Sequence, residues 1–242
     1  MNRKLFLLFF LLLVCRQTFA QESFKDDLNS PFTTSAKYVG LFGTIATGMI
    51  LVFEDQVVDP TQVEVVEDKA LGRYSHYGDL AGQGYPNLLY SAGMLLSYKL
   101  TDNPLLYNNA ILMVKATAYA SLVSTVLKTV VREPRPNDSD TKTSFPSGHA
   151  TMAFAFASTV ASLHEWYWGL AAYTMATTVA YSRMNDNKHF LHDVTAGATI
   201  GSVYGIGITE LFLKKQESNE SPNTFMLIPV QGGVSGVWGW NY

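Results

Sequence analysis

The sequence predicts an all-α protein built as a six-helix bundle. Six segments carry apolar residues at lengths and spacings that suit helices. These segments are rich in Ala, Gly, Thr and Met and contain few alternating β-branched residues. The chain has 242 residues, 48% of them hydrophobic and 15% charged. This length allows one domain with a sizeable core, and the composition lies between those of a soluble helical protein and a membrane protein with several spans.

The first twenty residues have the pattern of an export signal. Arg3 and Lys4 precede an unbroken apolar run over 5–14, and Thr18-Phe19-Ala20 offers a cleavage site. The run has ten residues, whereas a membrane-spanning helix needs about 20, so a cleaved signal is favoured over an uncleaved anchor. The only cysteine, Cys15, lies inside this segment. Cleavage would therefore exclude disulfides and cysteine-based metal sites or nucleophiles from the mature protein.

The remaining chain divides into a helical domain over 21–213 and a linker and tail over 214–242. Within the domain, 54–84 is polar and acidic at its start, which indicates a long loop or a surface helix. Segment 214–224 is expected to be a linker. Alternation from Phe225 to Pro229, followed by Gly232-Gly233, indicates a short C-terminal β-hairpin or an aromatic tail packed on the bundle. The six predicted helices cover 36–53, 85–100, 105–131, 149–164, 167–182 and 194–213.

Charge and motif content argue against nucleotide and nucleic-acid binding. The formal net charge is -3, so no basic surface for nucleic acid is expected. The sequence has no GxxxxGK[ST] loop and no dinucleotide-type GxGxxG between a strand and a helix.

A basic cluster ends the third predicted helix. Lys128 and Arg135 are seven residues apart, which is two helical turns, so both side chains can emerge on one side. Pro134 and Pro136 predict that the helix ends here. Taken alone, the cluster is typical of an ordinary helix end, where cations complement the dipole.

A second cluster, Pro146-Ser147-Gly148-His149, opens the fourth predicted helix after a polar loop. Ser147 is a candidate N-cap. The free N–H groups of a helix start beside the small Gly148 can bind an anion. The alternative is a simple cap, but a histidine directly after it favours a functional role.

The third cluster pairs a histidine with an aspartate. His189 and Asp193 are at i and i+4, so they share one face if the segment is helical. A carboxylate there can fix the tautomer of the ring and leave its other nitrogen free to attack. Arg183 precedes the pair by one short loop. His192 lies on a different face and is expected to be structural.

Together the clusters read Lys-x6-Arg-Pro, Pro-Ser-Gly-His and Ser-Arg-x5-His-x3-Asp, complete and in this order over 128–193. This pattern resembles the signature of the type-2 phosphatidic acid phosphatase superfamily, which also contains bacterial non-specific acid phosphatases and vanadium haloperoxidases. The resemblance implies the six-helix bundle of that superfamily and a phosphatase that acts on a phosphate monoester or diphosphate. A lipid-linked substrate is the favoured interpretation.

The resemblance also implies the catalytic roles. His189 would attack phosphorus and become a phosphohistidine, Asp193 would hold and polarise His189, and His149 would protonate the leaving oxygen. No metal or other cofactor is implied, because side chains supply the positive charge. The groups that would hold the phosphate oxygens are Lys128, Arg135, Ser147, Gly148 and Arg183.

Other functions stay open at this point. They are a non-specific periplasmic acid phosphatase for soluble esters, a vanadate-dependent haloperoxidase and a non-catalytic binding bundle. The expected partner is a phosphorylated small molecule or lipid, and the composition allows association with a membrane.

The chain is expected to be exported, periplasmic or membrane-associated, with its active site outside the cytoplasm. Two features disfavour full insertion in a membrane. Segments 149–164 and 167–182 are short for spans, and Lys115 lies inside the third predicted helix, where an unpaired charge is costly in lipid. A conflict also arises, because six spans after a cleaved signal would place both catalytic loops in the cytoplasm.

Overall fold

The computed structural model describes residues 21–137, 141–220, 224–230 and 233–239. The predicted export signal lies outside the described residues. All six predicted helices are confirmed, and their ends lie within three residues of the expected positions except at the C-terminal end of the last, which lies seven residues further on. They are α3 (Ala36–Val52), α6 (Tyr85–Thr101), α7 (Pro104–Val131), α8 (Gly148–Leu163), α9 (Trp166–Asn185) and α10 (Leu191–Glu220).

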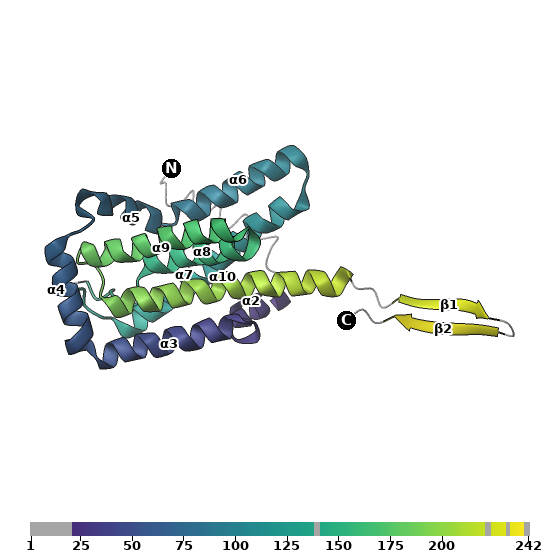
Figure 1. Ribbon diagram of the computed structural model, residues 1–242, viewed down its shortest axis with the longest axis horizontal. Coiled ribbons are helices and arrows are strands. Elements are labelled where there is room, and N and C mark those ends of the chain that lie inside the picture. The colour runs from purple at the N-terminus through teal and green to yellow at the C-terminus, as the bar shows by residue number, and fades with distance from the viewer. Residues whose placement is uncertain (1–20, 138–140, 221–223, 231–232, 240–242) are drawn as a thin grey trace.

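Several shorter helices were not among the six predicted, although 54–84 was expected to be either a long loop or a surface helix. Segment 54–84 is mostly helical rather than a loop, and Figure 1 shows α4 crossing one end of the bundle between α3 and α5. The prediction of a linker from residue 214 was wrong, since α10 continues to Glu220. The additional helices are α2 (Gln21–Thr33), the π-helix η1 (Glu54–Val58), α4 (Asp59–Asp68), the 3-10 helix η2 (Gly72–Tyr74) and α5 (Ser75–Gly82).

The predicted C-terminal hairpin is confirmed. Strand β1 (Thr224–Val230) pairs antiparallel with β2 (Gly233–Gly239), with Val230 opposite Gly233 and Thr224 opposite Gly239. It follows α10 in the chain and is coloured yellow in Figure 1.

A seam of small residues joins α8 to α10. Gly197, Gly201 and Gly205 repeat every fourth residue and face the backbone or Cβ atoms of α8. A Cβ atom on Gly201 would lie only 2.3 Å from the carbonyl oxygen of Thr151. Small residues at this spacing let two helix backbones approach closely. The seam therefore fixes the starts of α8 and α10 side by side.

Polar contacts tie α2 and Ser35, the residue before α3, to the C-terminal half of α10. Lys215 Nζ lies 2.6 Å from Asp26 Oδ2, and the backbone N–H of Ser35 donates to Glu210 at 3.0 Å. Because α10 begins at the opposite end, α2 lies at the end of the bundle that is far from residues 189–193.

Lys115 has a partner in the bundle. Its ammonium lies 2.7 Å from Asp27 Oδ2, and both side chains are largely buried. The unpaired charge that counted against membrane insertion is thus a paired one. The partner lies in α2, a helix that the sequence did not predict. Lys115 therefore no longer argues against membrane insertion.

The outer faces of the helices are strongly apolar. Among the described residues, α7 and the 191–218 part of α10 are long and apolar enough to cross a membrane. A third span results if α2 and α3, which meet at a bend of 66°, count as one. Large exposed apolar side chains on four helices include Phe42, Val52, Leu89, Leu96, Val126, Val130, Trp166 and Leu170. By length and composition, these helices suit a membrane.

Candidate active site

The structure brings all the predicted site residues to one end of the bundle, here called the site end, where α7 and α9 finish and α8 and α10 begin. Lys128 lies in the last turn of α7, His149 in the first turn of α8 and Arg183 in the last turn of α9. His189 precedes α10, and Asp193 lies in its first turn. The remaining predicted residues, Arg135, Ser147 and Gly148, follow α7 or open α8.

His189 and Asp193 form a buried pair. His189 Nδ1 lies 3.3 Å from Asp193 Oδ2, and the two side chains are 3% and 0% exposed. The same carboxylate oxygen accepts hydrogen bonds from the Ser144 hydroxyl and from the Phe190 N–H. Because Nδ1 faces the carboxylate, Nε2 is the ring nitrogen left for a substrate.

The electrostatic surroundings favour the neutral form of His189. Burial lowers the pKa of His189, and the positive charges of Lys128 and Arg135 act in the same direction, while Asp193 opposes them. A neutral imidazole has the lone pair that a nucleophile requires.

Two arginines near this pair keep unsatisfied donors. Arg183 is buried, and its NH1 group donates to the Asp79 carboxylate. Arg135 donates from NH2 to the Thr143 hydroxyl at 3.4 Å. The Nε atoms of both arginines are buried and have no acceptor among the described residues. Buried donors without partners are costly, so these N–H groups are suited to an anion that enters from outside.

Lys128 and Ser147 hold the backbone of the site. Lys128 Nζ donates to the carbonyl oxygens of Thr143 at 2.8 Å and Ser144 at 3.2 Å, and also to that of Pro146. Ser147 is the predicted N-cap of α8, and its hydroxyl accepts from the Ala150 N–H. The Ser147 N–H donates to the Asp193 carbonyl at 2.9 Å. These contacts fix the loop before α8 against the start of α10.

His149 faces a carboxylate that the sequence did not reveal. Its Nε2 lies 3.1 Å from Asp79 Oδ1 on α5. Burial lowers the pKa of His149 to about 4, and Arg183 and His189 add to this, while Asp79 raises it. Burial alone would raise the pKa of Asp79, but Arg183 and His149 hold it below its ordinary value.

His192 belongs to the supporting structure, as expected. It is fully buried, and its Nε2 lies 2.7 Å from Glu133 Oε1 and 3.6 Å from Asp193 Oδ1. Glu133, His192 and Asp193 lie close enough together to share a cation. Because Glu133 and His192 already bond to each other, we describe the trio as an ion-pair network behind Asp193.

Sequence reasoning missed two residues of the site, Asp79 and Ser144. Ser144 stands three residues before the predicted cap, and only its position hinted at a role. Asp79 lies in a segment without a motif, where the one signal was a pair of glycines, Gly78 and Gly82, around it.

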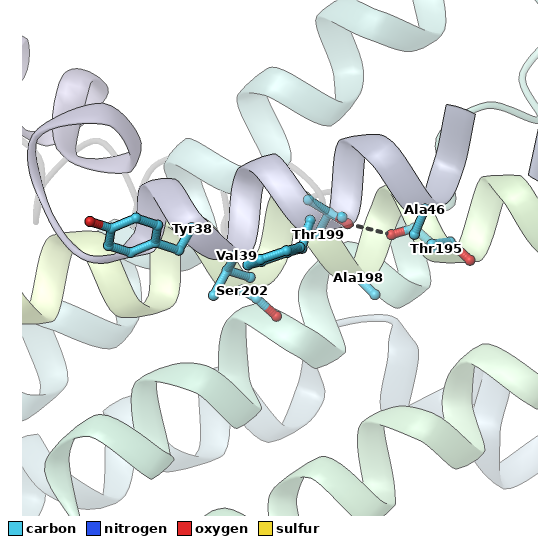
Figure 2. Close-up of a pocket in the computed structure, with 9 residues that line it drawn as sticks. Tyr38, Val39, Ala46, Thr195, Ala198, Thr199 and Ser202 are labelled. Atoms are coloured by element: carbon cyan, nitrogen blue, oxygen red, sulfur yellow. Dashed lines mark hydrogen bonds between the residues drawn. The ribbon is translucent and has the colours of Figure 1, made fainter. Parts of the chain in front are cut away.

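A pocket of about 500 Å³ lies elsewhere, on the outer side between α3 and α10 (Figure 2). Its lining is mostly apolar and includes Tyr38, Phe42, Thr195 and Ser202. None of the predicted site residues lines it. The chemistry of the chain therefore belongs to the site end and not to this pocket.

Fold and site together define a helical bundle with a buried His–Asp pair beside unpaired arginine donors. Residues 109–217 match the family model of the PAP2 superfamily. This match confirms the resemblance drawn from the three motifs over this part of the chain.

The chain is also similar to a protein that is named as a phosphatase. Over 72 residues, which are 28% of this chain, the sequence is 38% identical to the lipid A 1-phosphatase of Porphyromonas gingivalis. That segment is only 16% of the relative's length.

Two crystal structures share the fold. LpxE of Aquifex aeolicus is 23% identical, with a TM-score of 0.53 over 64% of this chain and 95% of that protein. A transmembrane PAP2-type phosphatidylglycerolphosphate phosphatase of Bacillus subtilis is 20% identical, with a TM-score of 0.55 over 74% of this chain and 95% of that protein.

Proposed function

We propose that this chain is a membrane phosphatase that hydrolyses a lipid-linked phosphate ester without a metal ion, through a phosphohistidine on His189. The observation that carries the proposal is the buried His189–Asp193 pair beside the unpaired Nε donors of Arg135 and Arg183. A nucleophile and fixed cations are what phosphoryl transfer requires.

In the first step, His189 Nε2 attacks phosphorus and the bond from phosphorus to the leaving oxygen breaks. Asp193 stabilises the positive charge that develops on the ring, because its carboxylate faces Nδ1. His149 gives its proton to the leaving oxygen, so the product is an alcohol. Charge on the equatorial oxygens is met by Arg135, Arg183 and the N–H groups at the start of α8.

In the second step, water attacks the phosphohistidine and the N–P bond breaks. His149, now neutral, accepts the proton from that water. Inorganic phosphate leaves, and both histidines return to their starting states. Every proton transfer uses a side chain of this protein.

The lipid-linked substrate is proposed on two grounds. The relative of Porphyromonas gingivalis and the Bacillus subtilis structure are named for phosphatases of lipids. The site end also lies at one end of both helices that can cross a membrane, α7 and α10, so a phosphate headgroup at the surface would meet the site. Within the chain, the helical phosphatase domain is proposed to begin at residue 21.

The test is phosphate release by purified protein in EDTA, with phosphatidate in detergent and a water-soluble aryl phosphate as substrates. We expect release in EDTA, a preference for the lipid and complete loss in His189→Ala. Near-full activity of His189→Ala would exclude the phosphohistidine. Loss of activity in EDTA, restored by added metal, would exclude the metal-independent mechanism.

A further inference from the structure

The short helix α5 lies directly against His149, the proposed general acid. A Cβ atom on Gly82 would lie 2.6 Å from His149 Cδ2, and one on Gly78 would lie 2.3 Å from the Ser182 hydroxyl oxygen. An eight-residue helix with two internal or terminal glycines has little stability of its own. Its position therefore depends on this close packing, which only glycine allows.

The packing brings Asp79 between two groups of the site. Its Oδ1 lies 3.1 Å from His149 Nε2 and accepts a hydrogen bond from Arg183 NH1. Its Oδ2 accepts from Gln83 Nε2 at 2.9 Å. Both oxygens of the carboxylate are therefore engaged, and Oδ1 links α5 to α8 and α9.

The contact to Arg183 determines which edge of the guanidinium is free. The five N–H donors of arginine form a rigid planar fork. Since NH1 is held by Asp79, rotation of the group is blocked, and the buried Nε has no acceptor among the described residues. This edge is the one that remains for a phosphate oxygen.

The contact between Asp79 and His149 affects whether the His149 ring carries a proton. The charged or titratable groups that face His149 are Asp79 on α5, Arg183 on α9 and His189 before α10. Asp79 alone among them favours the protonated ring, and burial opposes it. A general acid must carry a proton when the leaving oxygen departs.

We propose that Asp79 is a positioning residue that favours the protonated form of His149, the general acid, and aims Arg183 at the phosphate. The inference rests on the proposed phosphatase function and adds a residue outside the family match, which begins at residue 109. Asp79 does not touch the reacting atoms and acts only through its two neighbours.

The test compares an alkyl phosphate with an activated aryl phosphate in Asp79→Asn. The amide keeps the shape of the side chain but removes its charge. An aryl leaving group needs little protonation, whereas an alkoxide needs a general acid, whose contribution is about a hundredfold or more. We expect the ratio of the alkyl to the aryl kcat to fall by about tenfold or more. This ratio does not depend on how much of the variant folds.

Asp68→Asn on the exposed surface of α4 is the matched control and should keep the wild-type ratio. The alkaline decline of the alkyl kcat should also move to lower pH in Asp79→Asn. The direction follows because the activity needs protonated His149, and loss of the carboxylate lowers its pKa. An unchanged ratio and an unchanged pH profile, in an active enzyme, would overturn the role of Asp79 while leaving the proposed function intact.

A second measurement does not require turnover. The histidine ring protons can be titrated by NMR with inorganic phosphate at saturation, and His149→Gln assigns the signal among five histidines. We expect the midpoint of His149 to move to lower pH in Asp79→Asn. A midpoint equal to that of the wild type would overturn the proposal even if the protein proved inactive on every substrate.

Discussion

At the scale of single residues, Asp193 Oδ2 is the most crowded acceptor of the site. It receives the Ser144 hydroxyl, the Phe190 N–H and His189 Nδ1. Ser144 is fully buried and also lies 3.5 Å from His189 Nδ1. The hydroxyl therefore helps to define where the carboxylate, and with it the histidine ring, is held.

Replacing Ser144 by alanine should lower kcat by about tenfold with little change in KM, because removing one donor from a buried carboxylate costs roughly 1–3 kcal/mol. The measurement is steady-state kinetics on the best substrate. Ser162→Ala, which removes a hydroxyl from the other end of α8, is the control. A kcat equal to that of the wild type would show that Phe190 N–H alone suffices to hold Asp193.

Most of the candidate site could be predicted from the sequence, because its residues stand in short motifs at helix ends. Lys128 shows the limit of that reasoning. Its place in the first motif suggested a direct phosphate ligand, whereas its ammonium donates to three carbonyl groups of the following loop. Motif spacing identifies the residue, but only the path of the loop decides what its side chain contacts.

At the scale of elements, the long apolar helices were predictable and the short ones were not. Apolar periodicity over 16 to 30 residues identifies helices such as α8 and α10. By contrast, α5 has only eight residues, and α2 contains Pro31 within its 13. Such helices form because other helices bury one of their faces, and this information lies far away in the chain.

The seam between α8 and α10 gives a prediction at this scale. Gly201→Ala should destabilise the protein strongly, because its Cβ atom would lie 2.3 Å from the Thr151 carbonyl oxygen and both are backbone-anchored. Gly48→Ala on α3 is the control, since nothing lies within 4 Å of its Cβ position. Alanine in an open helix position is favoured by about 1 kcal/mol.

Thermal unfolding in detergent should therefore show a lower Tm for Gly201→Ala and an equal or higher Tm for Gly48→Ala. Equal Tm values for Gly201→Ala and the wild type would mean that the two helices can separate without cost.

At the scale of the whole molecule, the arrangement of the helices bears on which side of the membrane the active site faces. The sequence already showed a conflict between a cleaved signal and an active site outside the cytoplasm. Contacts place α2 beside the last part of α10, while the site lies where α10 begins. If α10 crosses the membrane, residue 21 and the active site lie on opposite sides. An outward-facing site then requires the start of α2 to remain inside, which a cleaved signal would not provide.

Cysteine labelling decides between these arrangements. In a Cys15→Ser background the chain has no other cysteine, so one can be placed at exposed Asp68 on the site end or at exposed Glu217 near the end of α10. We expect a membrane-impermeant maleimide to label the first in intact cells and the second only after lysis. The reverse pattern would place the active site in the cytoplasm, and labelling of both would exclude a membrane-crossing α10.

The ion pair between Asp27 and Lys115 has a consequence for biosynthesis. The two residues are 88 positions apart, with the aspartate earlier in the chain. The ribosome therefore synthesises α2 well before Lys115 of α7. If α7 crosses the membrane, the counterion of Lys115 has already been synthesised when α7 inserts. If α2 were deleted, α7 would have to insert without this counterion, which makes a lysine in lipid more costly.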